Sequence, residues 1–112
     1  MKISIILTNL NTDEVDKTDI ESDDRTHFTY IDNDKNMCEI VISNEDFLLQ
    51  KKAKDYSLEL CLKKVSYAKI ISSEGELNLD IKIVDFLIND DVLLWRYQID
   101  DEERQIEIVY RG

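Results

Sequence analysis

Strict alternation of apolar and polar side chains marks residues 76–83, which read Glu76-Leu77-Asn78-Leu79-Asp80-Ile81-Lys82-Ile83. Successive side chains of an extended strand point to opposite faces, so the four apolar residues share one face and the four polar residues the other. A helix would scatter the apolar side chains around its axis. The segment therefore predicts an antiparallel strand with one face in a core and one in water. In this register we expect Leu79 to be fully buried and Asn78 and Asp80 to be exposed.

The same two-residue period recurs along the rest of the chain. It is clear over residues 56–63 and 104–110, less regular over residues 2–10, 26–31, 37–43, 47–52, 65–72 and 92–99, and weakest over residues 15–21. Short polar segments rich in Asn, Asp and Ser separate the runs, as is typical of turns between hairpin strands. One helical turn is predicted at residues 44–49, where Ser43 or Asn44 would cap it and Glu45 and Asp46 suit its first turn.

The length of 112 residues suits a single domain spanning residues 1–112, and the chain contains no internal repeat and no proline. So many short strands in so small a chain would leave one apolar face wet if the sheet stayed flat and open. We therefore predict an all-β fold, an antiparallel meander barrel of about eight strands.

One family resemblance rests on the stretch Ser73-Glu74-Gly75-Glu76-Leu77-Asn78-Leu79-Asp80-Ile81, in which a glycine starts a long alternating strand. Strand-like runs precede it at residues 65–72 and follow it at residues 92–99 and 104–110. This order resembles that of the YwiB-like family of small bacterial proteins, over the C-terminal two thirds of the chain. The resemblance implies a calycin-like, lipocalin-like β-barrel. It implies no catalytic residues, and architecture of this kind does not by itself imply a ligand.

Composition excludes some partners and compartments. The chain has 14 Lys and Arg against 25 Asp and Glu, a net charge of −11, which argues against nucleic acid and anionic membranes as partners. No targeting segment is recognised, since the apolar run at residues 3–7 is too short for a signal peptide. Cys38 and Cys61 lie in apolar runs as small hydrophobes, with a disulfide between neighbouring strands left open. A cytoplasmic location is expected.

Catalytic and metal-binding constellations are not evident. His27 is the single histidine and is interpreted as an exposed strand residue, so no catalytic triad is expected. The run Asp32–Asn36 imitates the start of a calcium loop, but Met37 and Ser43 stand where such a loop has Gly and Glu. We interpret the run as a hairpin turn, with a weak divalent site there or at residues 100–103 as the alternative. No cofactor is expected, because Gly75 stands alone and no phosphate loop exists.

Two groups of side chains are candidate binding residues. The segment 51–64 has a net charge of +3, and its basic patch comprises Lys51, Lys52, Lys54, Lys63 and Lys64. Such a patch suits an anionic ligand or acidic partner, or else it protects a strand edge from aggregation. The second group consists of aromatic residues on inward positions, a candidate ligand pocket formed by Tyr56, Trp95, Tyr97 and Tyr110. In a small barrel such residues either fill the core or line a ligand site.

Two functions follow as hypotheses, and neither is enzymatic. The first is a small binding protein that holds an apolar or amphipathic molecule within the barrel. The second is a protein-interaction or assembly module with a filled core and no pocket, for which a strand edge or the basic patch would supply contacts. A homodimer is one form that such an assembly would take.

Overall fold

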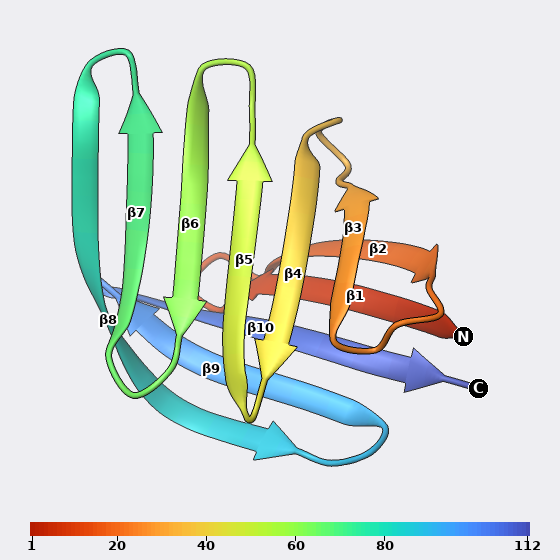
Figure 1. Ribbon diagram of the computed structural model, residues 1–112. Helices are drawn as coiled ribbons and strands as arrows, with labels where there is room; N and C mark the ends of the chain where they lie inside the picture. Colours follow the sequence, from red (N-terminus) through yellow and green to blue (C-terminus); the bar gives the residue numbers. More distant parts are fainter. The chain divides into compact units, whose positions relative to one another are not determined.

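The computed structural model describes all 112 residues and contains ten antiparallel strands and no helix (Figure 1). The strands are β1 (Lys2–Asn9), β2 (Glu14–Glu21), β3 (His27–Ile31), β4 (Met37–Ser43), β5 (Asp46–Lys52), β6 (Tyr56–Leu62), β7 (Ser66–Ser72), β8 (Gly75–Ile88), β9 (Val92–Ile99) and β10 (Glu102–Arg111). Every run with the two-residue period forms a strand, including the weakest one at residues 15–21. The predicted number of about eight strands is therefore wrong, and the all-β antiparallel class is confirmed.

The strands hydrogen-bond in the order β2-β1-β10-β9-β8-β7-β6-β5-β4-β3. Consecutive strands are neighbours, as short turns require, except β2 and β3, which stand at the two ends of this order. The first strand, β1, pairs with the last, β10. The chain divides into two compact units: unit 1 comprises residues 1–25 and 82–112, and unit 2 comprises residues 26–81. The boundary at residue 81 falls within β8, which begins beside β7 and ends beside β9 (Figure 1). A single domain and a closed barrel stay predictions.

Each unit has an apolar face made by alternate residues of its strands. In unit 1, β9 and β10 present Leu93, Trp95, Ile106 and Ile108, and β1 adds Ile3 and Ile5, all of them buried. In unit 2 the buried residues include Phe28, Ile40, Phe47, Leu49, Leu60 and Leu62. Cross-strand pairing aligns these residues, as Leu49 lies opposite both Ile40 and Leu60. The period read from the sequence thus places these residues on the buried face of each unit.

The two cysteines are free and buried, as small apolar residues would be. Cys38 lies opposite Lys51, and Cys61 lies opposite Leu48 on the same strand β5. Since Leu48 and Lys51 are three residues apart, they point to opposite faces of the sheet. The disulfide left open by the sequence therefore does not form. No helix in the structure has the length and apolar character needed to cross a membrane.

The helical turn predicted at residues 44–49 is wrong, because Asn44 and Glu45 form a two-residue turn between β4 and β5. Ser43 and Asp46 are the closing pair of this hairpin. Both turn residues have positive φ, 53° for Asn44 and 82° for Glu45. Positive φ at both positions characterises the type I′ turn, which matches the twist of the flanking strands. Asn adopts this conformation readily, whereas Glu at the second position is strained.

We expect Glu45→Gly to raise the free energy of unfolding by about 1 kcal/mol, because glycine carries no Cβ and adopts positive φ without strain. Urea unfolding of the wild type and the variant measures the difference. Asp46→Gly is the matched control: this neighbour lies in β5, so the same substitution is expected to destabilise there. A loss of stability on Glu45→Gly would contradict the turn.

Burial along the first half of β8 falls off toward the β7–β8 turn. Ile81 is 9% exposed, Leu79 is half-buried, and Leu77 is 53% exposed. Asn78 and Asp80 are exposed as predicted, so the register of the strand is confirmed. The expected full burial of Leu79 is wrong. Residues of β8 close to the β7–β8 turn have packing neighbours only on the side away from the turn. The apolar face of the strand therefore reaches the core at Ile81, opposite the buried Ser66.

This gradient predicts a graded response to alanine substitution. We expect Ile81→Ala to lower the free energy of unfolding by about 2–4 kcal/mol and Leu77→Ala by less than about 1 kcal/mol. Asp80→Ala, on the wet face, is expected to change it by no more than about 0.5 kcal/mol. Urea melts of the three variants provide the measurement. An Asp80 variant that costs more than the Ile81 variant would show that the register is inverted.

Candidate functional site: a groove on β3–β7

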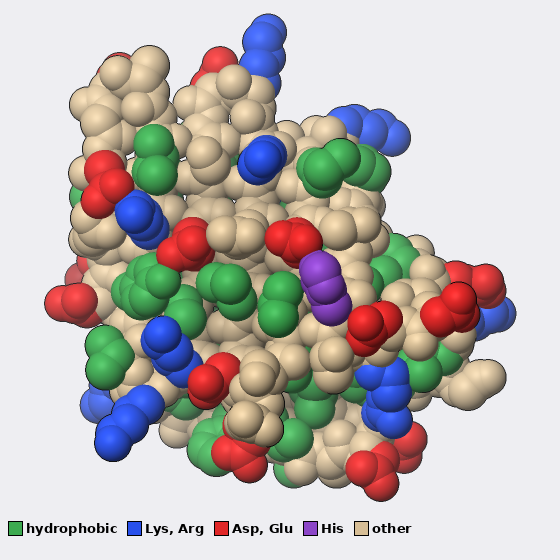
Figure 2. Space-filling model, in the orientation of Figure 1, with side chains coloured by type: hydrophobic (Ala, Val, Ile, Leu, Met, Phe, Trp, Pro, Cys, Tyr) green, Lys and Arg blue, Asp and Glu red, His purple; other side chains and the backbone are tan.

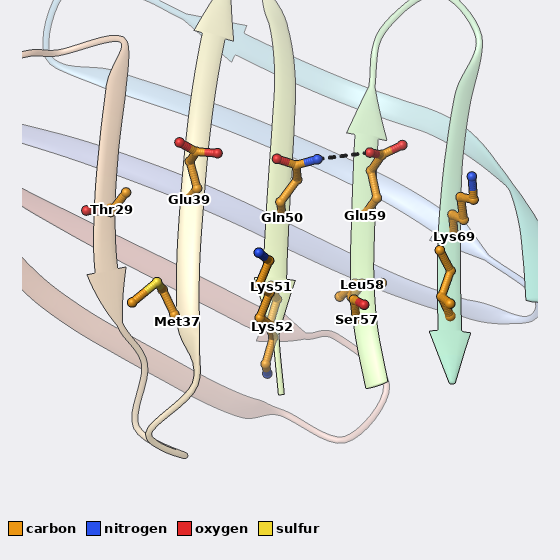
Figure 3. A pocket seen from close by; sticks show the side chains of 11 residues that line it. Thr29, Met37, Glu39, Gln50, Lys51, Lys52, Ser57, Leu58, Glu59 and Lys69 are labelled. Carbon is orange, nitrogen blue, oxygen red and sulfur yellow. Dashed lines mark hydrogen bonds between the residues drawn. The ribbon is translucent and has the colours of Figure 1, made fainter. Parts of the chain in front are cut away.

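One face of unit 2 carries a row of polar side chains that crosses its sheet. The row consists of directly opposed cross-strand partners, one from each strand: Thr29, Glu39, Gln50, Glu59, Lys69 and Asn78. Their sequence neighbours Phe28, Ile40, Leu49, Leu60 and Ala68 are buried on the opposite face. The row therefore follows directly from the two-residue period and the register of the sheet. Figure 3 shows the side chains of the first five on adjacent strands.

A second row lies two residues farther along each strand and is partly apolar. It runs through the cross-strand partners Ile31, Met37, Lys52, Ser57, Ile71 and Glu76. Met37 is 58% exposed and Ile71 is 45% exposed. The face thus places exposed apolar side chains next to charged and polar ones, which makes it amphipathic.

A groove of about 460 Å³ occupies this face. Its lining comes almost wholly from the two rows: Thr29, Met37, Glu39, Gln50, Lys51, Lys52, Ser57, Leu58, Glu59, Lys69 and Ile71 (Figure 3). Ser57 is the smallest side chain of the second row and lies between the longer Lys52 and Ile71. This difference in length hollows the face at Ser57. The volume lies within the range of about 300–1,000 Å³ that is typical of small-molecule sites.

Glu59 is held in place by two hydrogen bonds. Gln50 Nε2 donates to its Oε1 at 3.1 Å, and the Tyr67 hydroxyl donates to its Oε2 at 2.7 Å. The hydrogen bond from Tyr67, followed by that from Gln50, lowers the pKa of Glu59. The same bond to Glu59, together with burial, raises the pKa of Tyr67 to about 12. At neutral pH Glu59 is therefore a fixed anion and Tyr67 a fixed phenol, and neither is tuned for proton transfer.

The other charges along the groove differ in whether they have partners. His27 Nε2 lies 2.7 Å from Glu39 Oε2, with both side chains partly exposed, and the histidine is purple in Figure 2. Lys69 Nζ lies 3.5 Å from Glu76 Oε1. Lys52 and Lys54 are exposed and take part in no ion pair. Their ammonium groups are thus available to an anionic ligand.

A shallower groove continues from the first one toward the turn between β5 and β6. It shares Lys52, Ser57 and Ile71 with the first groove, and Lys54 and Tyr56 add to its lining. The two grooves therefore form one continuous depression. Lys52 and Lys54 lie at one end of it, and Met37 and the polar row line the other end. Figure 2 shows charges of both signs over this face.

The predicted basic patch is divided between three places. Lys52 and Lys54 lie at the β5–β6 turn, and Lys63 and Lys64 follow the far end of β6. The length of β6 separates these ends by roughly 20 Å. Lys51 points to the core side, where its Nζ lies 3.0 Å from Asp32 Oδ2. Burial alone would lower the pKa of Lys51, but the hydrogen bond and charge of Asp32 outweigh it and raise the pKa.

Asp32 anchors the hairpin turn between β3 and β4 that the sequence predicts. Its Oδ1 accepts hydrogen bonds from the backbone N–H groups of Asp34 and Asn36, both at 2.9 Å. Its Oδ2 forms the ion pair with Lys51 and lies 3.8 Å from the Cys38 sulfur. Burial is the main cause of the raised pKa of the Cys38 thiol. Protein groups thus occupy both oxygens of this carboxylate, and the thiol beside it is protonated at neutral pH.

The aromatic residues predicted to line a pocket lie in different environments. Trp95 and Tyr97 are buried on one face of β9, where burial raises the pKa of Tyr97 to about 12. Tyr110 is buried on β10, its ring 4.4 Å from the Arg25 guanidinium carbon and its hydroxyl donating to the Arg25 carbonyl at 2.8 Å.

Distance along β10 separates these residues within unit 1. Tyr97 is opposite Arg104, six residues before Tyr110 and therefore roughly 20 Å from it along the strand. Tyr56, in unit 2, is 39% exposed and lines the shallower groove. Of the four predicted aromatic residues, Tyr56 is thus the one that contributes to the candidate site on β3–β7.

Comparisons with known proteins yield one structural likeness. The chain is similar to the crystal structure of the ywiB protein from Bacillus subtilis, with 14% sequence identity, a TM-score of 0.43, and coverage of 99% of this chain and 88% of that chain. No protein-family model and no curated protein matches the chain. The matched structure bears the name of the family that the sequence resembles, while the calycin-like assignment stays a prediction.

Proposed function

We propose that the chain is a binding protein whose groove on β3–β7 takes an amphipathic small molecule with an anionic head group. The observation that carries the proposal is the groove of about 460 Å³. It combines the exposed apolar side chains of Met37 and Ile71 with the unpaired cations Lys52 and Lys54 of the adjoining depression. Small-molecule sites combine apolar surface, which gives affinity, with placed polar groups, which fix the orientation of the ligand.

The head group of the ligand is inferred from the charges that have no partner. Glu59 is satisfied by Gln50 and Tyr67, and Glu39 lies against His27. Lys52 and Lys54 have no such partner, so a carboxylate or phosphate at that end of the groove would gain charge-assisted hydrogen bonds. The apolar part of the molecule would then lie over Met37 and Ile71.

A binding role is favoured over an enzymatic one. Two groups on the groove face that could act as acid or base are held in their ordinary protonation states: Glu59 is charged and Tyr67 is protonated. Catalytic acids and bases instead need pKa values near the working pH. We further propose, from the family resemblance and the meander order, that the sheet closes into a calycin-like barrel. A cytoplasmic location belongs to the same proposal.

Filling the groove tests the proposal. We expect the wild type to bind octanoate, used as a probe with an anionic head and an apolar tail, and Ser57→Tyr to weaken that binding at least about tenfold, because the ring would occupy the hollow at Ser57. Tyrosine suits strands, so the fold should persist. Calorimetric titration measures the affinities.

The matched control is Ser43→Tyr, at an exposed strand position that does not line the groove. Its affinity for octanoate should equal that of the wild type. Equal binding by the wild type and Ser57→Tyr would refute the assignment of the groove.

A further inference from the structure

The second half of β8, residues 82–88, forms an edge of the sheet of unit 1. Pairing between β7 and β8 ends with Ser66 and Ile81, because β7 begins at Ser66. In unit 1 the strand order is β2-β1-β10-β9-β8, so residues 82–88 have β9 as their neighbour within the unit. An edge of this kind presents unpaired main-chain groups that another strand can use.

This edge carries large apolar side chains that are exposed. Val84 is 46% exposed, Phe86 55% and Leu87 52%. Val84 and Phe86 lie on one face of the strand and Leu87 on the other. Natural edge strands are usually protected by charges, proline or bulges. Apolar residues on both faces of an exposed edge instead mark an interaction site.

The main chain at Phe86 is oriented toward this edge. At the turn into β9, the Asn89 N–H donates to the Val92 carbonyl. Since main-chain groups of successive strand residues point to opposite edges, the Phe86 N–H, three residues earlier, points away from β9. It donates to Asp85 Oδ1, on its own neighbouring residue, at 2.9 Å. That donor is thus held by a local, replaceable bond at an exposed position.

The charge around the edge is negative. Residues 1–25 and 82–112 contain seven basic and fifteen acidic side chains, a net charge of −8 for unit 1. Within residues 82–91, Lys82 is the single basic residue beside Asp85, Asp90 and Asp91. A second copy of the chain would bring an equally acidic edge to the same place, whereas a basic segment would be attracted.

We propose that the edge of β8 at residues 82–88 binds an extended segment of another protein in which apolar and basic residues alternate. The segment would add a strand beside β8 through main-chain hydrogen bonds, and its apolar side chains would cover Val84 and Phe86. Its basic residues would face Asp85 and the acidic turn that follows β8. This inference is independent of the groove on β3–β7, since it concerns other residues and a different kind of partner.

The test uses two seven-residue peptides with blocked ends, one alternating lysine and valine and the other alternating glutamate and valine. We expect the basic peptide to bind the full chain at least about tenfold more tightly than the acidic one, and added salt to reduce the difference. Phe86→Ser should weaken binding of the basic peptide at least about tenfold, because it removes the central apolar contact without adding a charge.

Leu77→Ser is the matched control, because Leu77 lies on the same strand, is similarly exposed at 53% and is already opposite Ile70 of β7. It should leave peptide binding unchanged. Equal affinity for the two peptides, or an equal loss of binding from Leu77→Ser, overturns the proposal. So does a dimer of the protein alone that Phe86→Ser dissociates, because the occupant would then be a second copy. Ser57→Tyr should keep peptide binding, which separates this proposal from that of the groove.

Discussion

Phe47→Ala is expected to lower the free energy of unfolding by about 3–5 kcal/mol, the usual cost of truncating a fully buried phenylalanine. Phe47 is 1% exposed and lies opposite Ile42 on β4 and the buried Leu62 on β6. The truncation removes apolar contacts with both neighbouring strands and leaves a cavity in the buried face.

Phe86→Ala is the matched control for this substitution. Phe86 also lies on a strand but is 55% exposed, so its truncation should cost less than about 1 kcal/mol. Urea unfolding followed by circular dichroism measures both variants. Equal costs for the two phenylalanines would contradict the assignment of the buried face of β5.

Asp32→Ala is expected to lower the free energy of unfolding by about 3 kcal/mol. The substitution leaves the ammonium group of Lys51, whose side chain is 18% exposed, without its partner, and leaves two backbone N–H groups without acceptors. Removing one member of a buried ion pair is costly mainly because the other charge stays behind. Asp34→Ala, at an exposed position of the same turn, should cost no more than about 0.5 kcal/mol.

The pH dependence of Asp32 has a definite sign. Burial alone would raise the pKa of Asp32, but hydrogen bonds from Asn36, Lys51 and Asp34, together with the charge of Lys51, outweigh it and lower the pKa. A lowered folded-state pKa adds stability that is present above the ordinary value of about 4 and is lost as the pH falls through the folded pKa. The stability difference between the wild type and Asp32→Asn should therefore be full at pH 6 and shrink below about pH 4. A difference that grows on acidification would contradict the ion pair.

The strands were predictable because a sheet with one buried face requires an apolar side chain at every second residue. All ten runs with this period form strands, and Asn78 and Asp80 lie on the exposed face as expected. The depth of burial was less predictable: it depends on neighbours beyond the strand itself, so Leu79 near a hairpin end is only half-buried. The extension of β8 to Ile88 was missed because the alternation fails after Ile83, where Val84 takes a polar position and Asp85 an apolar one.

Local ambiguity explains the wrong helical turn. Ser, Asn and Asp suit both a helix cap and a hairpin turn, and the positive φ of Asn44 and Glu45 becomes evident only when β4 and β5 pair. The inward position of Lys51 could have been predicted, because Phe47, Leu49 and Lys51 occupy alternate positions and therefore the same face of β5. This pattern distinguishes Lys51 from the exposed lysines and indicates a buried partner for its ammonium group.

The groove could not be predicted from the sequence, because its two rows exist only through register. Met37, Lys52, Ser57 and Ile71 come from four strands and become neighbours when those strands pair. No single segment carries a pattern for the groove. The aromatic residues, by contrast, were predicted from their inward strand positions. Trp95 and Tyr97 are buried on β9, whereas Tyr56, at the start of β6, is 39% exposed.

An NMR titration of the isotopically labelled chain with octanoate tests the central claim, that the groove on β3–β7 is the binding site. We expect octanoate to shift the backbone amide signals of Lys52, Ser57 and Ile71 and to leave the indole N–H signal of Trp95 unchanged. Octylamine should cause smaller shifts, because its cationic head group has no partner at Lys52 and Lys54. Shifts centred on Trp95 and Tyr97, or an equal response to both head groups, would contradict this claim.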